Sequence, residues 1–281
     1  MSEGNRTTNP IKRVIRNQVV GMFNDSQRGE VPVVRSRNAL FTPTSVAWRV
    51  HGDVASMMAG GIASLLLQML HPSVLAGVWD HSNFRTDMHG RLRRTARFIA
   101  TTTYADRSEA EAMIRRVRSV HDGVRGHLPD GTAYDANDPA LLAWVHVTET
   151  RSFLDAWIRY GEPWMSRADQ EQYFAEMALI GGALGADPLP RTRREADRLI
   201  AGMRPALKVD ARTAEVARLI LHPAATSRLA AMPGRLAGQA GVDLLPRWAR
   251  ALHGLSPSAL RTPLVRAGTL GVAQALRWAF R

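Results

Sequence analysis

Two short segments place arginine, histidine and threonine at helical spacing. In "RVRSVHDGVRG", Arg118 and His121 lie three residues apart. In "GRLRRTARF", Arg91 is followed by Arg94 three residues on and by Thr95 four residues on. Side chains at these spacings project from one face of a helix. Two such helices could face one flat ligand and offer it an imidazole and several guanidinium groups. Haem has this requirement, because its iron takes an axial nitrogen and its propionates pair with cations.

The residues alone leave other interpretations of the first segment open. Its arginines at 116, 118 and 125 also suit a solvated helix face or a phosphate-binding patch. A single histidine on a helix is more often a hydrogen-bonded structural residue than a metal ligand. Spacing by itself therefore favours the structural role for His121.

The composition and the missing motifs exclude several kinds of chemistry. The 281 residues include no cysteine, which excludes disulfides, thiolate zinc sites, iron–sulfur clusters and cysteine nucleophiles. The sequence has no Gly-x-x-x-x-Gly-Lys phosphate loop, Gly-x-Ser-x-Gly elbow or His-Glu-x-x-His zinc motif. A di-iron bundle needs Glu-x-x-His from two helices, and "HVTE" has the reverse order. Any metal must be held by other side chains or by a cofactor.

The net charge of +12 is concentrated toward the C-terminus, where residues 211–281 contain ten arginines and two acidic residues. The chain has no zinc-finger, RNA-binding or basic-zipper pattern, so we predict no specific nucleic-acid partner. The final segment, residues 262–281, is amphipathic and basic. It is expected to pack on the domain as a last helix, and it is also a candidate for peripheral contact with an anionic membrane.

The hydrophobic pattern is helical throughout, which predicts one all-α globular domain of about ten helices over residues 46–281. Residues 1–45 form a polar arm interrupted by Pro10, Pro32 and Pro43. The apolar segment at residues 54–70 has 17 residues, and we interpret it as a buried helix rather than a membrane span. The start of the chain has no signal-peptide pattern, so we expect a cytoplasmic protein, with peripheral membrane contact as an option.

Local signals predict where several helices begin and end. Ser108 and Glu111 have the spacing of a capping box, which would place His121 well inside the helix and Gly126 near its end. Asp138-Pro139 is expected to start the longest helix, and Ser166 to cap the next one. For the remaining histidines we expect a capping role for His71, a structural or pocket-lining pair of Asp80 and His81, and a satisfied core position for His146.

Five stretches together resemble the catalytic domain shared by bacterial rubber oxygenases (latex-clearing proteins) and the fungal endoplasmic-reticulum-bound oxygenase of the mycophenolic acid pathway. They occur in the family's order and cover about residues 48–250: "LLLQMLHPSVLAGVWDHSNFRTD", "GRLRRTARFIATTTY", "RVRSVHDGVRG", "YDANDPALLAWVHVTETRSFLDAW" and "YFAEMALIGGALG".

The resemblance implies a haem b protein with a globin-like helical core. The family's Arg-x-x-His motif, here Arg118 and His121, would supply the iron ligand and its support. The Arg-x-x-x-Thr motif, here Arg91 and Thr95, would lie near haem and substrate. We therefore expect His121, Arg118 and Arg91 to bind the cofactor, and Arg91, Arg94 and Thr95 to act in catalysis. The substrates would be O₂ and an apolar, isoprenoid- or lipid-like molecule.

Two positions depart from the rubber-cleaving branch. Arg94 stands where a lysine of that branch can cap the distal iron position, and a guanidinium has no free lone pair for iron. Leu75 or a neighbour falls about where the catalytic glutamate of those enzymes should be, so the polyisoprene-cleaving mechanism is not carried over. A non-enzymatic haem or lipid binder of the same fold, and a basic membrane-surface binder, are the alternative functions.

Overall fold

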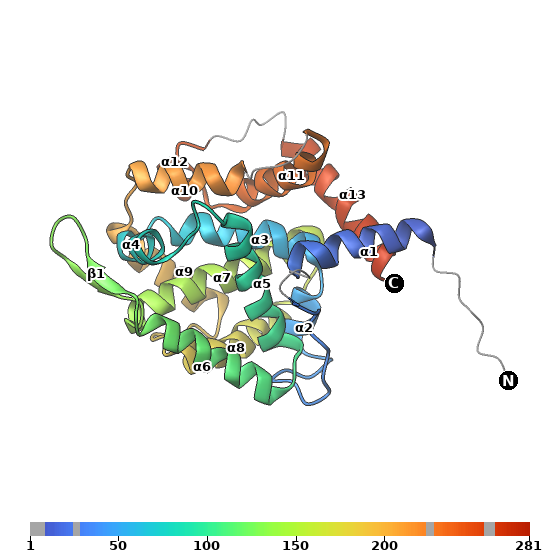
Figure 1. The fold of residues 1–281 in the computed structure, drawn as a ribbon, viewed down its shortest axis with the longest axis horizontal. Coiled ribbons are helices and arrows are strands. Elements are labelled where there is room, and N and C mark those ends of the chain that lie inside the picture. The colour runs from blue at the N-terminus through green and yellow to red at the C-terminus, as the bar shows by residue number, and fades with distance from the viewer. Residues whose placement is uncertain (1–8, 25–28, 223–227, 256–261) are drawn as a thin grey trace.

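The computed structural model describes residues 9–24, 29–222, 228–255 and 262–281 (Figure 1). These parts of the chain form thirteen α-helices, a short 3-10 helix and one two-stranded hairpin. Their bounds are α1 Pro10–Phe23, α2 Val46–His51, α3 Val54–Gln68, α4 Pro72–His81, α5 Met88–Tyr104, α6 Arg107–His121, β1 Arg125–His127, β2 Ala133–Asp135, α7 Pro139–Tyr160, α8 Arg167–Leu184, α9 Arg193–Met203, η2 Arg204–Ala206, α10 Ala211–Leu221, α11 Arg228–Leu244, α12 Arg247–Leu252 and α13 Thr262–Phe280. The predicted all-α fold is confirmed.

Helices α3 and α7 form the centre of the domain. They run antiparallel, because Gly60 of α3 packs against Phe153 of α7, whereas Trp144 Nε1 donates to the Gln68 carbonyl at 3.3 Å. A Cβ on Gly60 would lie 2.8 Å from Phe153 Cδ1, so glycine allows this close approach. The predicted buried helix is thus confirmed as α3.

The other helices cover this pair on two sides. In Figure 1, α10, α11 and α12 lie above α3, and α6 and α8 lie on the opposite side of the domain. Helices α5 and α6 are joined by only two residues and diverge from that turn, with α5 rising toward α3 (Figure 1). The short helix α2 contacts α3, α5, α7 and α8, so it closes one end of the interior.

Some predicted helix boundaries are confirmed and others are wrong. The side chain of Asp138 accepts a hydrogen bond from Ala140 N at 2.8 Å, and α7 starts there as predicted. Ser166 caps α8 as predicted. The N-cap of α6 is Asp106 rather than Ser108, because its carboxylate accepts from both the backbone and the hydroxyl of Ser108.

Helix α6 also ends earlier than predicted, at His121, and Gly126 lies in strand β1 opposite Tyr134. A turn through Asp122 and Gly123 stops the helix, and Val124 N donates to the His121 carbonyl at 2.8 Å. Strand pairing then replaces helical hydrogen bonds. The result places His121 at a helix end, beside the base of the hairpin.

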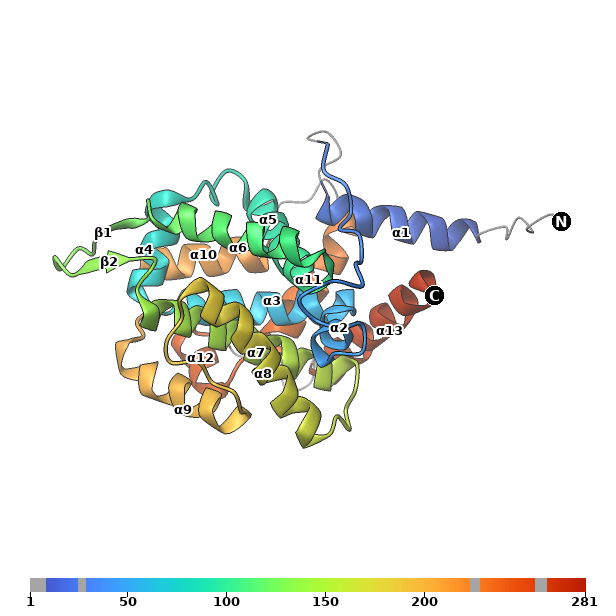
Figure 2. The same cartoon turned by 90° about the horizontal axis from the view of Figure 1, so that it is seen from below.

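The region predicted as a polar arm contains the helix α1, which packs beside α13 at the edge of the molecule (Figures 1 and 2). The domain boundary between residues 45 and 46 stays a prediction, as does the globin-like character of the core. Within the described segments no single helix is long and apolar enough to cross a membrane. The bent pair α3 and α4, with 105° between them, meets the length and composition test together.

Candidate functional site

His121 presents a partly buried imidazole at the last position of α6. Its Nδ1 atom is buried and has no hydrogen-bond partner among the described residues. Burial lowers the pKa of this imidazole, and the charges of Asp122 and Asp135 oppose that effect. The neutral form is therefore favoured, and a neutral imidazole has a nitrogen lone pair to offer a metal.

Arg118 fixes the helix end that carries His121. Its Nη1 atom donates to the carbonyl of Ala183 in the last turn of α8 at 3.2 Å. On the other side, Asn137 donates to Asp122 Oδ1 at 2.8 Å. The two contacts hold the end of α6 between α8 and the hairpin. Arg118 and His121 are thus neighbours on one helical turn, with Arg118 in a supporting position.

His71 offers a second buried imidazole nitrogen without a partner. It is the N-cap residue of α4, at the predicted position, but its side chain makes no capping hydrogen bond. Its Nδ1 is buried and unpaired within the described part of the chain. Burial lowers its pKa, against the charge of Asp138. Asp138 begins α7 and Asp135 lies at the hairpin, so both imidazoles face the same end of the domain.

Arg91 extends from the first turn of α5 into apolar surroundings. It lines a small space of about 10 Å³ with side chains from α3, α4 and α10, including Leu65, Val78 and Val216. Its Nη1 donates to Ser82 Oγ at 3.1 Å, and no acidic partner is found for it in the described residues. Burial, followed by repulsion from Arg94, lowers its pKa. A largely buried guanidinium without a counter-ion is costly, which makes it a candidate for binding an anion.

Arg94 and Thr95 are exposed, and their hydrogen bonds go to residues of α5 and of the segment that joins α4 to α5. Arg94 donates to Asn83 Oδ1 at 3.0 Å and lies 3.7 Å from an oxygen of Asp87. The Thr95 hydroxyl donates to the carbonyl of Arg91 at 3.3 Å. The structure therefore brings Arg91, Arg94 and Thr95 together, where α4 leads into α5.

The five predicted residues thus form two groups rather than one cluster. No hydrogen bond or ion pair within the described ranges joins the group on α5 to Arg118 and His121 on α6. Helices α5 and α6 diverge from the turn that joins them, and the first turn of α5 and the last turn of α6 are the ends away from that turn (Figure 1). Both groups are available to one bridging ligand only if it spans the space between these helices.

Glu149 is a candidate that the sequence analysis missed. It lies on α7, is only partly exposed, and makes no hydrogen bond or ion pair to a described residue. Desolvation raises its pKa to about 7. Its charge raises the pKa of Tyr173 further, after the larger effect of burial, so the two groups are close. The available signal was an acidic residue inside the otherwise apolar "LLAWVHVTET".

His146, one turn before Glu149, is buried as predicted but makes no hydrogen bond to the described residues. Burial lowers its pKa to about 4. A Cβ on Gly181 would lie 3.0 Å from both Cδ2 and Cε1 of its ring. The glycine therefore makes room for the imidazole face, and His146 is an apolar packing element rather than a hydrogen-bonded one.

Asp80 and His81, at the end of α4, contact Tyr134 of strand β2 at the surface. The hydroxyl of Tyr134 donates to Asp80 Oδ2 at 2.7 Å and lies 3.3 Å from His81 Nε2. Both Asp80 and His81 are exposed. This arrangement favours the structural role over the pocket-lining one.

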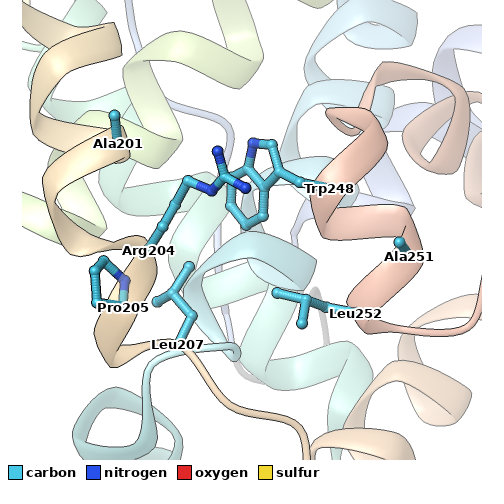
Figure 3. Close-up of a pocket in the computed structure, with 7 residues that line it drawn as sticks. All are labelled: Ala201, Arg204, Pro205, Leu207, Trp248, Ala251 and Leu252. Carbon is cyan, nitrogen blue, oxygen red and sulfur yellow. The ribbon is translucent and has the colours of Figure 1, made fainter.

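A pocket of about 710 Å³ lies elsewhere, between η2 and α12 (Figure 3). Its walls include Leu207 and Leu252, and the guanidinium of Arg204 lies 5.1 Å from the Trp248 ring centroid. None of the predicted site residues lines it. It is open to the surface.

A haem iron fits these residues better than a protein-only metal site does. In the described part of the chain, no group of three or more histidine and carboxylate residues could hold a metal ion. Haem iron needs one protein ligand, because the porphyrin supplies the other in-plane nitrogens. His121 offers an imidazole with an unpaired nitrogen, and Arg91 a partly buried guanidinium with no acidic partner found in the described residues, which are the kinds of group that an iron and a propionate would take.

Comparison with known proteins agrees with the resemblance noted in the sequence. The family model described as the catalytic domain of ER-bound oxygenase mpaB/B′ and rubber oxygenase matches residues 48–278. Comparison with curated proteins and with solved structures found no match. The match covers most of the chain, and the protein belongs to the mpaB/rubber oxygenase catalytic-domain family.

Proposed function

We propose that this oxygenase domain binds haem b through His121 and oxidises an apolar, isoprenoid- or lipid-like small molecule with O₂. The observation that carries the proposal is the buried, unpaired Nδ1 of His121 in a family of oxygenase catalytic domains. A ring whose nitrogens make no hydrogen bond can turn either one toward a metal. When bound, haem supplies the binding and activation of O₂.

The chain's own residues have distinct proposed roles around that cofactor. His121 holds the iron, and Arg118 keeps the end of α6 against α8 through the carbonyl of Ala183. Arg91 offers its guanidinium to a propionate, which would supply the counter-charge that the protein does not. Arg94 and Thr95, one turn further along α5, would orient the substrates. Arg94 has no free lone pair and would not serve as a ligand to the iron.

The apolar surroundings of Arg91 support an apolar substrate and a dry site. The side chains that face it from α3, α4 and α10 include Leu65, Val78 and Val216. Such walls exclude water, which strengthens the electrostatic effect of the guanidinium. They also offer a substrate no hydrogen bonds, so recognition would depend on shape and apolar contact.

The test is an absorption spectrum of the purified protein with haemin, for the wild type and for three histidine variants. We expect a Soret band in the wild type that His121→Ala abolishes or strongly shifts. His127→Ala is the control, because His127 is exposed on β1 close by. His71→Ala tests the competing imidazole. Loss of the band in His71→Ala alone would identify His71 as the iron ligand. A wild type that stays colourless with haemin would disprove haem binding.

The same samples distinguish an open from a closed distal position. We expect the spectrum of a single strong nitrogen ligand, because Arg94 cannot donate one. A spectrum with two strong nitrogen ligands would contradict this.

Oxygen consumption with candidate apolar substrates separates the proposed enzyme from a non-enzymatic haem binder. The enzyme would consume O₂ only with its substrate, and the binder would show the band without turnover. We also propose a cytoplasmic location.

A further inference from the structure

The two ends of the chain meet in a pair of helices at one edge of the molecule. Helices α1 and α13 lie side by side and extend from the body of the domain (Figures 1 and 2). Arg16 Nε donates to the carbonyl of Ala279 at 2.5 Å, and Lys12 Nζ lies 5.0 Å from the Trp278 ring centroid. We call this pair the α1–α13 surface.

Helix α1 has no buried residue, although its sequence is rich in apolar side chains. Ile11 is 60% exposed, Val14 is 54% exposed and Met22 is 48% exposed. A helix of 14 residues is marginal in isolation. Its apolar face therefore gains little from the contacts seen here, and it is available to a further partner.

Helix α13 is firmly attached by its inner face. Arg266 donates to both oxygens of Asp243 at 2.8 and 3.0 Å. Arg277 donates to Asp53 Oδ2 and to the Tyr160 carbonyl, each at 2.7 Å. The helix is thus packed on the domain, as expected from the sequence, and its outer face has a fixed direction.

Helix α13 exposes large apolar side chains at both ends, with Leu264 near its start, and with Trp278 and Phe280 at its end beside Lys12 and Arg16 of α1. Leu264 is 74% exposed, Trp278 is 43% exposed and Phe280 is 47% exposed. Arg266 is the one charged residue among the exposed positions of this helix, and Asp243 neutralises it.

The charges around these apolar side chains have one sign. Neither α1 nor α13 contains an acidic residue, whereas α1 contributes Lys12, Arg13 and Arg16, and Arg281 follows α13. We propose that the α1–α13 surface binds anionic lipid membranes peripherally. Exposed Leu, Trp and Phe insert into the interface, and the cations attract anionic headgroups.

Two other partners fit this surface less well. A symmetric dimer through the same patch would bring the cations of one copy against those of the other. Nucleic acid would pair with the arginines but would give the exposed Leu264 and Trp278 no apolar contact. The lack of a spanning helix among the described residues agrees with binding at the membrane surface rather than insertion.

The test is co-sedimentation of the full chain with two kinds of vesicle, phosphatidylcholine alone and phosphatidylcholine mixed with phosphatidylglycerol. We expect binding to the anionic vesicles only, weakened by high salt. Trp278→Ala should reduce that binding on the order of tenfold, because it removes an interfacial anchor and the partner of Lys12. Trp164→Ala is the matched control, since Trp164 is 93% exposed before α8 and should have no effect.

Arg13→Glu probes the charge separately, at an exposed position where misfolding is not a concern. It should also reduce binding on the order of tenfold, and both α1–α13 variants should keep the wild-type absorption spectrum with haemin. The proposal is overturned if the wild type ignores anionic vesicles, or if Trp164→Ala weakens binding as much as Trp278→Ala. A wild type that sediments as a dimer and becomes monomeric in Trp278→Ala would assign the surface to self-association instead.

Discussion

Two imidazoles, one at the end of α2 and one at the end of α6, differ in their hydrogen bonding. Near α2, His51 uses both ring nitrogens: Nδ1 lies 2.7 Å from Thr103 Oγ1, and Nε2 lies 2.8 Å from the Tyr173 hydroxyl. Burial lowers its pKa to about 3, so it stays neutral. At the other end, the buried Nδ1 of His121 has no partner in the described residues. Both nitrogens of His51 thus have hydrogen-bond partners, whereas Nδ1 of His121 has none.

The carboxylates of the interior show the same contrast. Glu176 accepts from Ala47 N at 2.7 Å and Val46 N at 3.3 Å, and it thereby caps the start of α2. Glu149 has no such donor, and its pKa is raised. Buried polar groups are normally hydrogen-bonded, and the exceptions reduce stability. The unpaired imidazole of His121 and the unpaired carboxylate of Glu149, which lies near Tyr173, are therefore two separate places where a ligand or a proton could complete the structure.

The largest expected effect comes from breaking the completed network. His51→Ala leaves the Thr103 and Tyr173 hydroxyls without this partner and opens a cavity, so we expect a loss of roughly 4 kcal/mol in the free energy of unfolding. His121→Ala, without haem, should change it by less than about 1 kcal/mol, because no hydrogen bond is lost. Chemical denaturation of both variants checks this. Equal losses would remove the distinction between the two ends.

The next effect depends on pH. Burial raises the pKa of Glu149 from 4.5 to about 7, so the folded protein holds this proton more tightly than the unfolded chain does. Its contribution to stability is complete below pH 4.5 and is lost as pH rises through about 7. Glu149→Gln cannot ionise, so its stability relative to the wild type should rise by about 3 kcal/mol between pH 4 and pH 8.

Thermal unfolding of Glu149→Gln and wild type across this pH range is the measurement. Glu111→Gln, which changes an exposed carboxylate on α6, is the control and should show no such trend. A difference between Glu149→Gln and wild type that is independent of pH would show that Glu149 is not desolvated.

A smaller effect is expected at Arg118. Arg118→Ala removes the hydrogen bond to Ala183 that ties α6 to α8, at an exposed side chain, so the loss should be about 1 kcal/mol or less. It should also speed the transfer of haem to a scavenging apoprotein, because His121 is held less firmly. Arg116→Ala, on the same helix, is the control. Unchanged haem loss in Arg118→Ala would argue against a supporting role.

The smallest effect on stability is expected at Thr95. Its hydroxyl bonds only to the carbonyl of Arg91 within the described segments and is exposed, so Thr95→Val should change the free energy of unfolding by less than about 0.5 kcal/mol. A fall in O₂ consumption without loss of stability or of haem would assign Thr95 to the reaction. Unchanged O₂ consumption would assign it to the helix surface.

The all-α class, the family resemblance and several helix starts could be predicted from the sequence. Asp138 and Ser166 were recognisable as caps because a capping side chain bonds to a backbone two or three residues away, which is local information. The same spacing argument placed Arg118 and His121 on one turn. It failed at Ser108, because Asp106 caps α6 two residues earlier and accepts hydrogen bonds from both the backbone and the hydroxyl of Ser108.

Which polar groups have hydrogen-bond partners could be seen only in the folded structure. His51 and His121 are each the last residue of a helix, and their difference depends on Thr103 and Tyr173, which are distant from His51 in the chain. The environment of Glu149 and the meeting of α1 with α13 are likewise unreadable from spacing. Desolvation and hydrogen bonding depend on what packs against a residue, and that is set by contacts between elements far apart in sequence.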